Sequence, residues 1–230
     1  SGYDRGTMLS GTWELDEPQA PDHGYRTGRI KLGTESSGGF KNITVTNCIF
    51  EHCRGLALET VDGGHLEDIE ISHITMRHIV NAGIFLRLGA RMRSPEGTPA
   101  GSMKRIRISH INAYDVDSRY SSIISGIPNG IIEDVTFDHI HLYYKGGYTK
   151  EDGKRELPEQ EKVYPEPWMF GTIPAKGFYI SHAKNISFHH INFYYEKPDG
   201  RPLFVTKDVE NIRLTDIQEN GENVSVTINQ

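Results

Sequence analysis

Charged side chains gather in a short glycine-rich stretch of the sequence. GRIKLGTESSGGF, residues 28–40, contains the cations Arg29 and Lys31 and the acid Glu35. Such a stretch could cradle a phosphate, form a turn of a repeating β-structure, or line a sugar-binding cleft. A phosphate-binding P-loop requires GK[ST] and a following helix, and neither is present here. The phosphate interpretation is therefore set aside, and the surrounding sequence must decide between the other two.

Four histidines offer a second possible chemistry. They lie at one equivalent position of a repeated segment, which is occupied in turn by Asn47, His73, His110, His139, His190 and Asp216. A metal site needs side chains that converge on one point, whereas equivalent residues of stacked repeats point in parallel. We interpret them as a ladder of polar side chains at a turn, where they bond backbone groups left unpaired by a bend. The sequence predicts no metal site and no cofactor.

The repeated segment itself predicts the fold. Six copies align without gaps: NITVTNCI (42–49), DIEISHIT (68–75), RIRISHIN (105–112), DVTFDHIH (134–141), NISFHHIN (185–192) and NIRLTDIQ (211–218). Each copy alternates apolar and polar residues, which is the period of a β-strand. The apolar anchors of the copies are Ile43, Ile69, Ile106, Val135, Ile186 and Ile212.

A second, shorter strand is expected between the copies. Examples are RIKLG (29–33), GLALE (55–59), GIFLR (83–87), GFYIS (177–181) and PLFVT (202–206). Strands that recur along the whole chain predict an all-β parallel solenoid, in which each coil buries its apolar face on the next. A sandwich or propeller is the alternative, but tight hairpin dipeptides between the strands are few. We expect residues 1–230 to form one domain.

Two long intervals between the copies predict insertions, at about 88–102 and about 145–174. Loops on a rigid scaffold often carry function. The second insertion contains YPEPWMFG, in which Tyr164 and Trp168 lie beside prolines, as is typical of a wall on which sugars stack. The alternative is that these aromatic residues, with Met169 and Phe170, pack the loop onto the flank of the solenoid.

The composition argues against several classes of protein. The net charge is −6, and no run of five or more basic residues forms a nucleic-acid-binding face. No segment has 18 consecutive apolar residues, so no membrane-spanning helix is expected. The two cysteines, Cys48 and Cys53, are too few for a disulfide framework and lack metal-binding spacing. We expect both to be free and buried or half-buried.

The motifs GRIKLGTESSGGFKNITVTNC, GLALETVDGG, FLRLGAR, YPEPWMFG and GFYISHAKNI together resemble bacterial members of glycoside hydrolase family 28, the polygalacturonase-like enzymes of pectin degradation. The resemblance covers nearly the whole chain. It implies a single-stranded right-handed parallel β-helix, a secreted or periplasmic location, and inverting hydrolysis by two aspartates and water without a metal.

The resemblance also implies where the catalytic acids should lie. In the family they belong to N-x-D and Asp-Asp motifs on two successive coils, and neither N-T-D nor D-D occurs in this sequence. We interpret the stretch with Asp4, Asp16 and Asp22 as an extended loop. The catalytic residues are therefore unknown and are expected upstream of residue 1, so the chain resembles the C-terminal portion of a longer β-helix.

The substrate-binding residues can be carried over by position. The family's R-I-K motif, whose cations grip a galacturonate carboxylate, falls on Ala57, Leu58 and Glu59, and its G-H-G histidine falls near Gly28. Compensating cations are available on the outward face of the short strands. The resulting substrate-binding set is Arg29, Lys31, Glu35, Glu59, Asp62, Arg87, Tyr164 and Trp168. The alternative is a cross-coil ion-pair ladder, Lys31–Glu59–Arg87, which contributes little if it is exposed.

Three functions remain open at this point. The first is a pectin hydrolase that acts on galacturonan or rhamnogalacturonan, with a pectic carbohydrate as partner. The second is a non-catalytic carbohydrate-binding β-helix, which the missing aspartates favour. The third is a polysaccharide lyase, which usually needs Ca²⁺ on an acidic cluster that the sequence does not show. An uncapped first coil would favour association with an N-terminal half or self-association.

Overall fold

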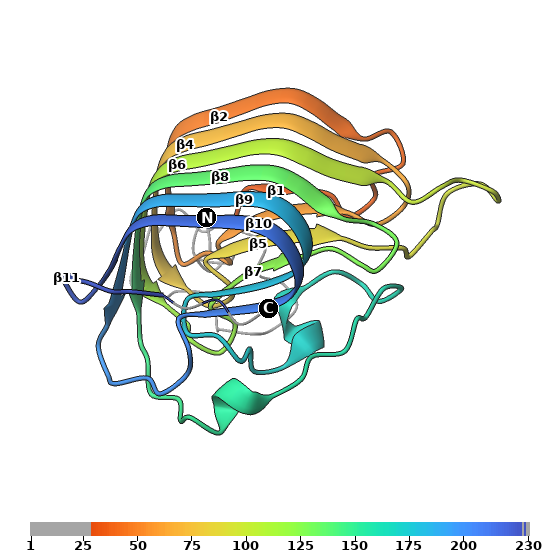
Figure 1. The fold of residues 1–230 in the computed structure, drawn as a ribbon. Helices are drawn as coiled ribbons and strands as arrows, with labels where there is room; N and C mark the ends of the chain where they lie inside the picture. Colours follow the sequence, from red (N-terminus) through yellow and green to blue (C-terminus); the bar gives the residue numbers. More distant parts are fainter. Residues whose placement is uncertain (1–28, 227, 229–230) are drawn as a thin grey trace, which may run out of the picture.

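The computed structural model describes residues 29–226 and 228, which fold almost entirely into β-strands (Figure 1). Strands account for 55% of the described residues and helices for 4%. The strands wind around one apolar interior, and successive coils stack in chain order from β2 to β10. The prediction of a parallel β-helix is confirmed. The extended loop expected around Asp4, Asp16 and Asp22, and the position of Gly28, lie outside the described residues.

Two series of strands build the coils. The long strands are β2 (Phe40–Glu51), β4 (His65–Ile79), β6 (Ser102–Val116), β8 (Ile132–Tyr144), β9 (Phe178–Tyr195) and β10 (Phe204–Glu219). The short strands are β1 (Lys31–Leu32), β3 (Leu56–Thr60), β5 (Ile84–Leu88) and β7 (Ser122–Ser125). Neighbouring coils pair in parallel, and the one antiparallel ladder between named strands joins β10 to β11 (Glu222–Asn223).

The register of the coils follows the sequence repeat. All six anchors pair in one row, in the order Ile43, Ile69, Ile106, Val135, Ile186 and Ile212. The apolar positions of β4, β6, β8 and β9 are fully buried in a continuous core. Phe137 and Phe188 stack in this core with ring centroids 4.8 Å apart. The period-two pattern therefore sets which side chains enter the interior.

The polar ladder marks a corner of each coil. Every ladder residue, from Asn47 to Asp216, has a positive φ, between 53° and 58°. Asn, Asp and His are the non-glycine residues most tolerant of this left-handed conformation, which explains why they recur there. The histidine rings stack from His73 to His110, His139 and His190, with centroids 4.6, 5.0 and 4.4 Å apart. The stacking expected of the ladder is confirmed, but the hydrogen bonds of His139 and His190 go to the carboxylate of Asp138 rather than to backbone groups.

Both insertions lie between the predicted strands. The first follows β5, which ends at Leu88, and the second follows β8, which ends at Tyr144. The second insertion contains two 3₁₀ helices, η1 (Asp152–Lys154) and η2 (Pro167–Phe170), and lies against the solenoid in Figure 1. Cys48 is half-buried, Cys53 is buried, and both are free, as expected. No helix of the described residues is long and apolar enough to span a membrane.

A second apolar cluster fixes the long insertion to the outward face of the short strands. It consists of Ala57, Ala82, Phe85, Tyr120, Ile123, Leu157, Met169, Phe170, Ile173, Ala175 and Tyr179. Met169 and Phe170 are buried in it, whereas Tyr164 and Trp168 remain 44% and 48% exposed. The insertion therefore covers the outward face of β5 and β7 and leaves the region beside β1 open.

Candidate functional site

A cleft of about 550 Å³ opens beside β1 and the rear of the long insertion. Its lining consists of Arg29, Lys31, Gly33, Thr34, Glu35, Arg54, Tyr164, Glu166 and Trp168. Five of the eight substrate-binding residues predicted from the sequence are in this lining: Arg29, Lys31, Glu35, Tyr164 and Trp168. The structure therefore brings residues from the first described coil together with the aromatic end of the insertion.

Strand alternation and the insertion together position these side chains. Lys31 lies in β1, and Arg29 is two residues earlier, so both side chains point outward from the solenoid. Pro167 begins η2 and Glu166 is its N-cap residue. Trp168 is the second residue of this short helix, and Tyr164 lies two residues before Glu166. All three side chains line the cleft.

Three cations surround the carboxylate of Glu166. Arg29 donates two hydrogen bonds to it, one from Nη1 to Oε2 at 3.3 Å and one from Nη2 to Oε1. Lys31 Nζ is 3.5 Å and Arg54 Nη1 is 3.6 Å from Oε1. Asn81 Nδ2 also donates to Oε2 at 3.3 Å. Glu166 therefore holds the cations in place from the loop side.

The carboxyl of Glu59 lies beneath the cations and is completely buried. Its Oε2 is 2.8 Å from Lys31 Nζ and 3.2 Å from Thr34 Oγ1, whereas its Oε1 has no hydrogen-bond partner. Burial raises the pKa of Glu59 to about 7, and the nearby charge of Glu166 adds to the effect. Lys31 and Arg29 oppose this shift but do not cancel it, because burial is the larger effect. Glu59 supports the floor of the cleft rather than lining it.

The charges of the cleft favour an anionic ligand. Arg29, Lys31 and Arg54 face two carboxylates, and that of Glu59 is half protonated near neutral pH. At the rim, Glu35 accepts a hydrogen bond from Arg91 Nη2 at 3.2 Å. The floor of the cleft therefore carries at least one more positive charge than negative charge. Exposed Tyr164 and Trp168 add flat apolar surfaces beside it.

The structure uses Asp62 to hold the first insertion. Arg91 bonds both carboxylate oxygens of Asp62, and the Arg93 backbone N–H donates to Oδ1 at 3.0 Å. Burial raises the pKa of Asp62, but these bonds together outweigh it and hold the pKa below its usual value. Asp62 lies outside the cleft lining.

The structure uses Arg87 to hold the second insertion. Arg87 is 1% exposed, and its guanidinium donates to Ser125 Oγ at 2.7 Å and to the carbonyl oxygens of Glu159 and Gln160 at 2.7 and 3.0 Å. Arg87 pairs with Glu59 in the strand register, but no ion pair joins them. Of the alternative ladder Lys31–Glu59–Arg87, only the first pair forms, because the loop carbonyls occupy Arg87.

Sequence reasoning missed four residues of the cleft lining: Gly33, Thr34, Arg54 and Glu166. Glu166 lies within the motif YPEPWMFG, whose acid between two prolines was the available signal. Arg54 lies in the connection before β3 and follows no repeat position, so no sequence signal pointed to it.

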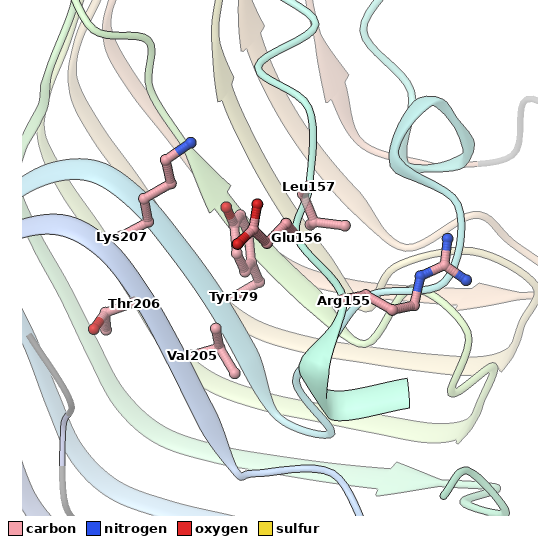
Figure 2. A pocket seen from close by; sticks show the side chains of 7 residues that line it. All are labelled: Arg155, Glu156, Leu157, Tyr179, Val205, Thr206 and Lys207. Atoms are coloured by element: carbon pink, nitrogen blue, oxygen red, sulfur yellow. The ribbon is translucent and has the colours of Figure 1, made fainter. Parts of the chain in front are cut away.

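A second hollow of about 380 Å³ lies where the insertion meets β9 and β10 (Figure 2). In this view Lys207 and Arg155 lie on opposite sides of the hollow, with Tyr179 between them. Lys207 bonds Glu159, which is also 2.9 Å from His182 Nε2. The charged groups here tie the insertion to the solenoid, and the hollow offers no exposed aromatic face.

One group of described side chains could hold a metal ion: Asp138, His139 and His190, which lie outside the lining of both hollows. No protein-family model, curated protein or solved structure matches this chain. The chemistry of the cleft is therefore what supports a function.

Proposed function

We propose that this chain is the saccharide-binding portion of a pectin-degrading glycoside hydrolase, and that its cleft binds an acidic sugar of galacturonan or rhamnogalacturonan. The observation that carries the proposal is the cluster of Arg29, Lys31 and Arg54 beside two exposed aromatic side chains. The parallel β-helix and the sequence resemblance to family 28 enzymes agree with it.

The contacts expected for a uronate follow from the cleft's chemistry. Its carboxylate would meet Arg54 and Lys31, since a guanidinium offers paired donors that match a carboxylate. Its ring would stack on Trp168, which is exposed, whereas the ring of Tyr164 already has Lys31 Nζ 5.2 Å and Arg91 Cζ 5.9 Å from its centroid. The hydroxyl of exposed Tyr164, which accepts a hydrogen bond from buried Thr34 Oγ1 at 3.1 Å, is positioned to bond a sugar hydroxyl. The volume of the cleft is in the range of small-ligand sites.

Hydrolysis needs a second set of groups. Inverting cleavage requires one carboxylic acid for the leaving oxygen and one carboxylate for water. In the described cleft Glu59 is covered and Glu166 is bound by three cations, so the proposal places the catalytic acids outside the described residues. The same observation favours a second candidate, a carbohydrate-binding β-helix that performs no cleavage.

Binding of trigalacturonate to the full chain, measured by calorimetry, tests the proposal. We expect the acid to bind and its methyl ester to bind at least about tenfold more weakly, since the ester removes the charge. Arg54→Met should weaken binding of the acid similarly, whereas Arg107→Met, an exposed position on β6, should not. Equal affinities for acid and ester, or no binding of either, would overturn the proposal.

Release of reducing sugar separates the two candidates. The substrates are homogalacturonan and rhamnogalacturonan oligosaccharides, and the enzyme is the same full chain. A lyase also creates reducing ends but leaves an unsaturated uronate, so release without an unsaturated product would identify a hydrolase. It would also place catalytic acids within these 230 residues. Binding without release would identify this chain as a binding module when it acts alone.

A further inference from the structure

The corner ladder departs from its pattern at one step, between β8 and β9. The residues that precede the corner pair across the coils in one row: Thr46, Ser72, Ser109, Asp138, His189 and Thr215. Asp138 is the one acid in this row. It therefore sits beside two stacked imidazole rings, those of His139 and His190, whose centroids are 4.4 Å apart.

The two rings converge on one atom of Asp138. His139 Nδ1 is 2.8 Å from Asp138 Oδ1, and His190 Nδ1 is 3.0 Å from the same oxygen. The rings are inclined by 29°, whereas His110 and His139 at the preceding step are parallel. Convergence of two ring nitrogens on one point is what a metal site requires and what a purely parallel ladder lacks.

We infer that Asp138, His139 and His190 form a binding site for a divalent transition-metal ion such as Zn²⁺. Imidazole nitrogens with a carboxylate oxygen are a ligand set that suits zinc. Tetrahedral zinc ligands lie about 3.3 Å apart, and the ligand atoms here all lie within 4.8 Å of one another. A small rotation of the Asp138 carboxylate would let the ion occupy the point where the two nitrogens meet.

The surroundings of the site suit a cation with water as its remaining ligand. The three side chains are between one third and one half exposed, so solvent reaches the open positions. Asp216, the next ladder residue, has Oδ2 3.9 Å from His190 Nε2. At this distance the two atoms are not hydrogen-bonded, so Asp216 contributes negative charge near the site rather than a fixed orientation of the ring. The bound ion would join β8 to β9, which are neighbouring coils.

The chain itself supplies conservative test variants. His190→Asn introduces asparagine, the residue that the first described coil has at this corner as Asn47. Asp138→Ser introduces serine, which two other coils have at the equivalent position as Ser72 and Ser109. The matched control is His73→Asn, because His73 is the other end of the histidine ladder. It also stacks on a single imidazole, but no acid joins it.

Calorimetric titration of the tag-free, chelator-treated full chain with Zn²⁺ is the measurement. We expect wild-type protein to bind Zn²⁺, His190→Asn and Asp138→Ser to bind it at least about tenfold more weakly, and His73→Asn to bind it as wild type does. The inference is overturned by three outcomes. They are no Zn²⁺ binding by wild-type protein, unchanged binding in both site variants, and an equal loss in His73→Asn. Circular dichroism establishes that each variant is folded. If one site variant does not fold, the other by itself tests the inference.

Discussion

The buried carboxyl of Glu59 makes the stability of this protein depend on pH. Its pKa is raised from 4.5 to about 7, chiefly by burial, so the folded protein holds a proton there that the unfolded chain has released. The stabilisation is complete below pH 4.5 and is lost as the pH rises to 7. A shift of this size corresponds to about 3 kcal/mol of unfolding free energy.

Glu59→Gln removes this titration and keeps the shape of the side chain. We expect the variant to match wild type at pH 4.5 and to be more stable by up to about 3 kcal/mol at pH 8. Urea unfolding followed by circular dichroism, at several pH values, gives the difference between the two proteins. Groups that titrate alike in both proteins contribute nothing to this difference.

The control is Glu35→Gln, whose carboxylate lies in the same cleft but is mostly exposed. We expect its stability to follow wild type within about 0.5 kcal/mol at every pH. Parallel curves for wild type and Glu59→Gln would refute the reasoning. So would a Glu59→Gln protein less stable than wild type at pH 8, because the ion pair with Lys31 would then outweigh burial.

Three further substitutions test other parts of the structure. Arg87→Met removes the donor of four hydrogen bonds, those to Ser125 Oγ and to the carbonyl oxygens of Gly126, Glu159 and Gln160. We expect urea unfolding to show a loss of about 3 kcal/mol and limited proteolysis to cut the second insertion faster. Phe188→Ala opens a cavity among the stacked rings and should cost about 3–5 kcal/mol, measured in the same way. His110→Val places a β-branched residue at a φ of 53° and should cost about 1–2 kcal/mol, whereas His110→Asn should be nearly neutral; equal losses would contradict the corner interpretation.

The coil repeat could be read from the sequence because its signals are local and periodic. The anchors from Ile43 to Ile212 pair in one row and mark the positions that point inward. Every copy of the repeat has the same alternation. The corner residues carry a backbone requirement of their own, a positive φ, which limits their choice to a few residue types. The strand register, the buried core and the corner ladder follow from the periodic anchors and from the positive φ at the corner.

The roles of the charged residues were decided by the paths of the insertions. Arg29 meets Glu166 across 137 residues of sequence, and Arg87 is taken up by loop carbonyls more than 70 residues away. No periodic pattern encodes such contacts, because an insertion follows no repeat and its course depends on what it packs against. The sequence could therefore offer Arg87 and Asp62 as ligand-binding candidates but could not show that the loops occupy them.

The same division applies at the metal-binding corner. The sequence by itself determined that four histidines share one position and stack in a ladder. Only the tertiary structure decided that Asp138 lies beside two of them, because an acid one place before the corner is ordinary until the next coil brings His190 within 3.0 Å of it. Asp138 and His190 are 52 residues apart in the sequence, so their contact depends on how the coils stack and not on any one segment.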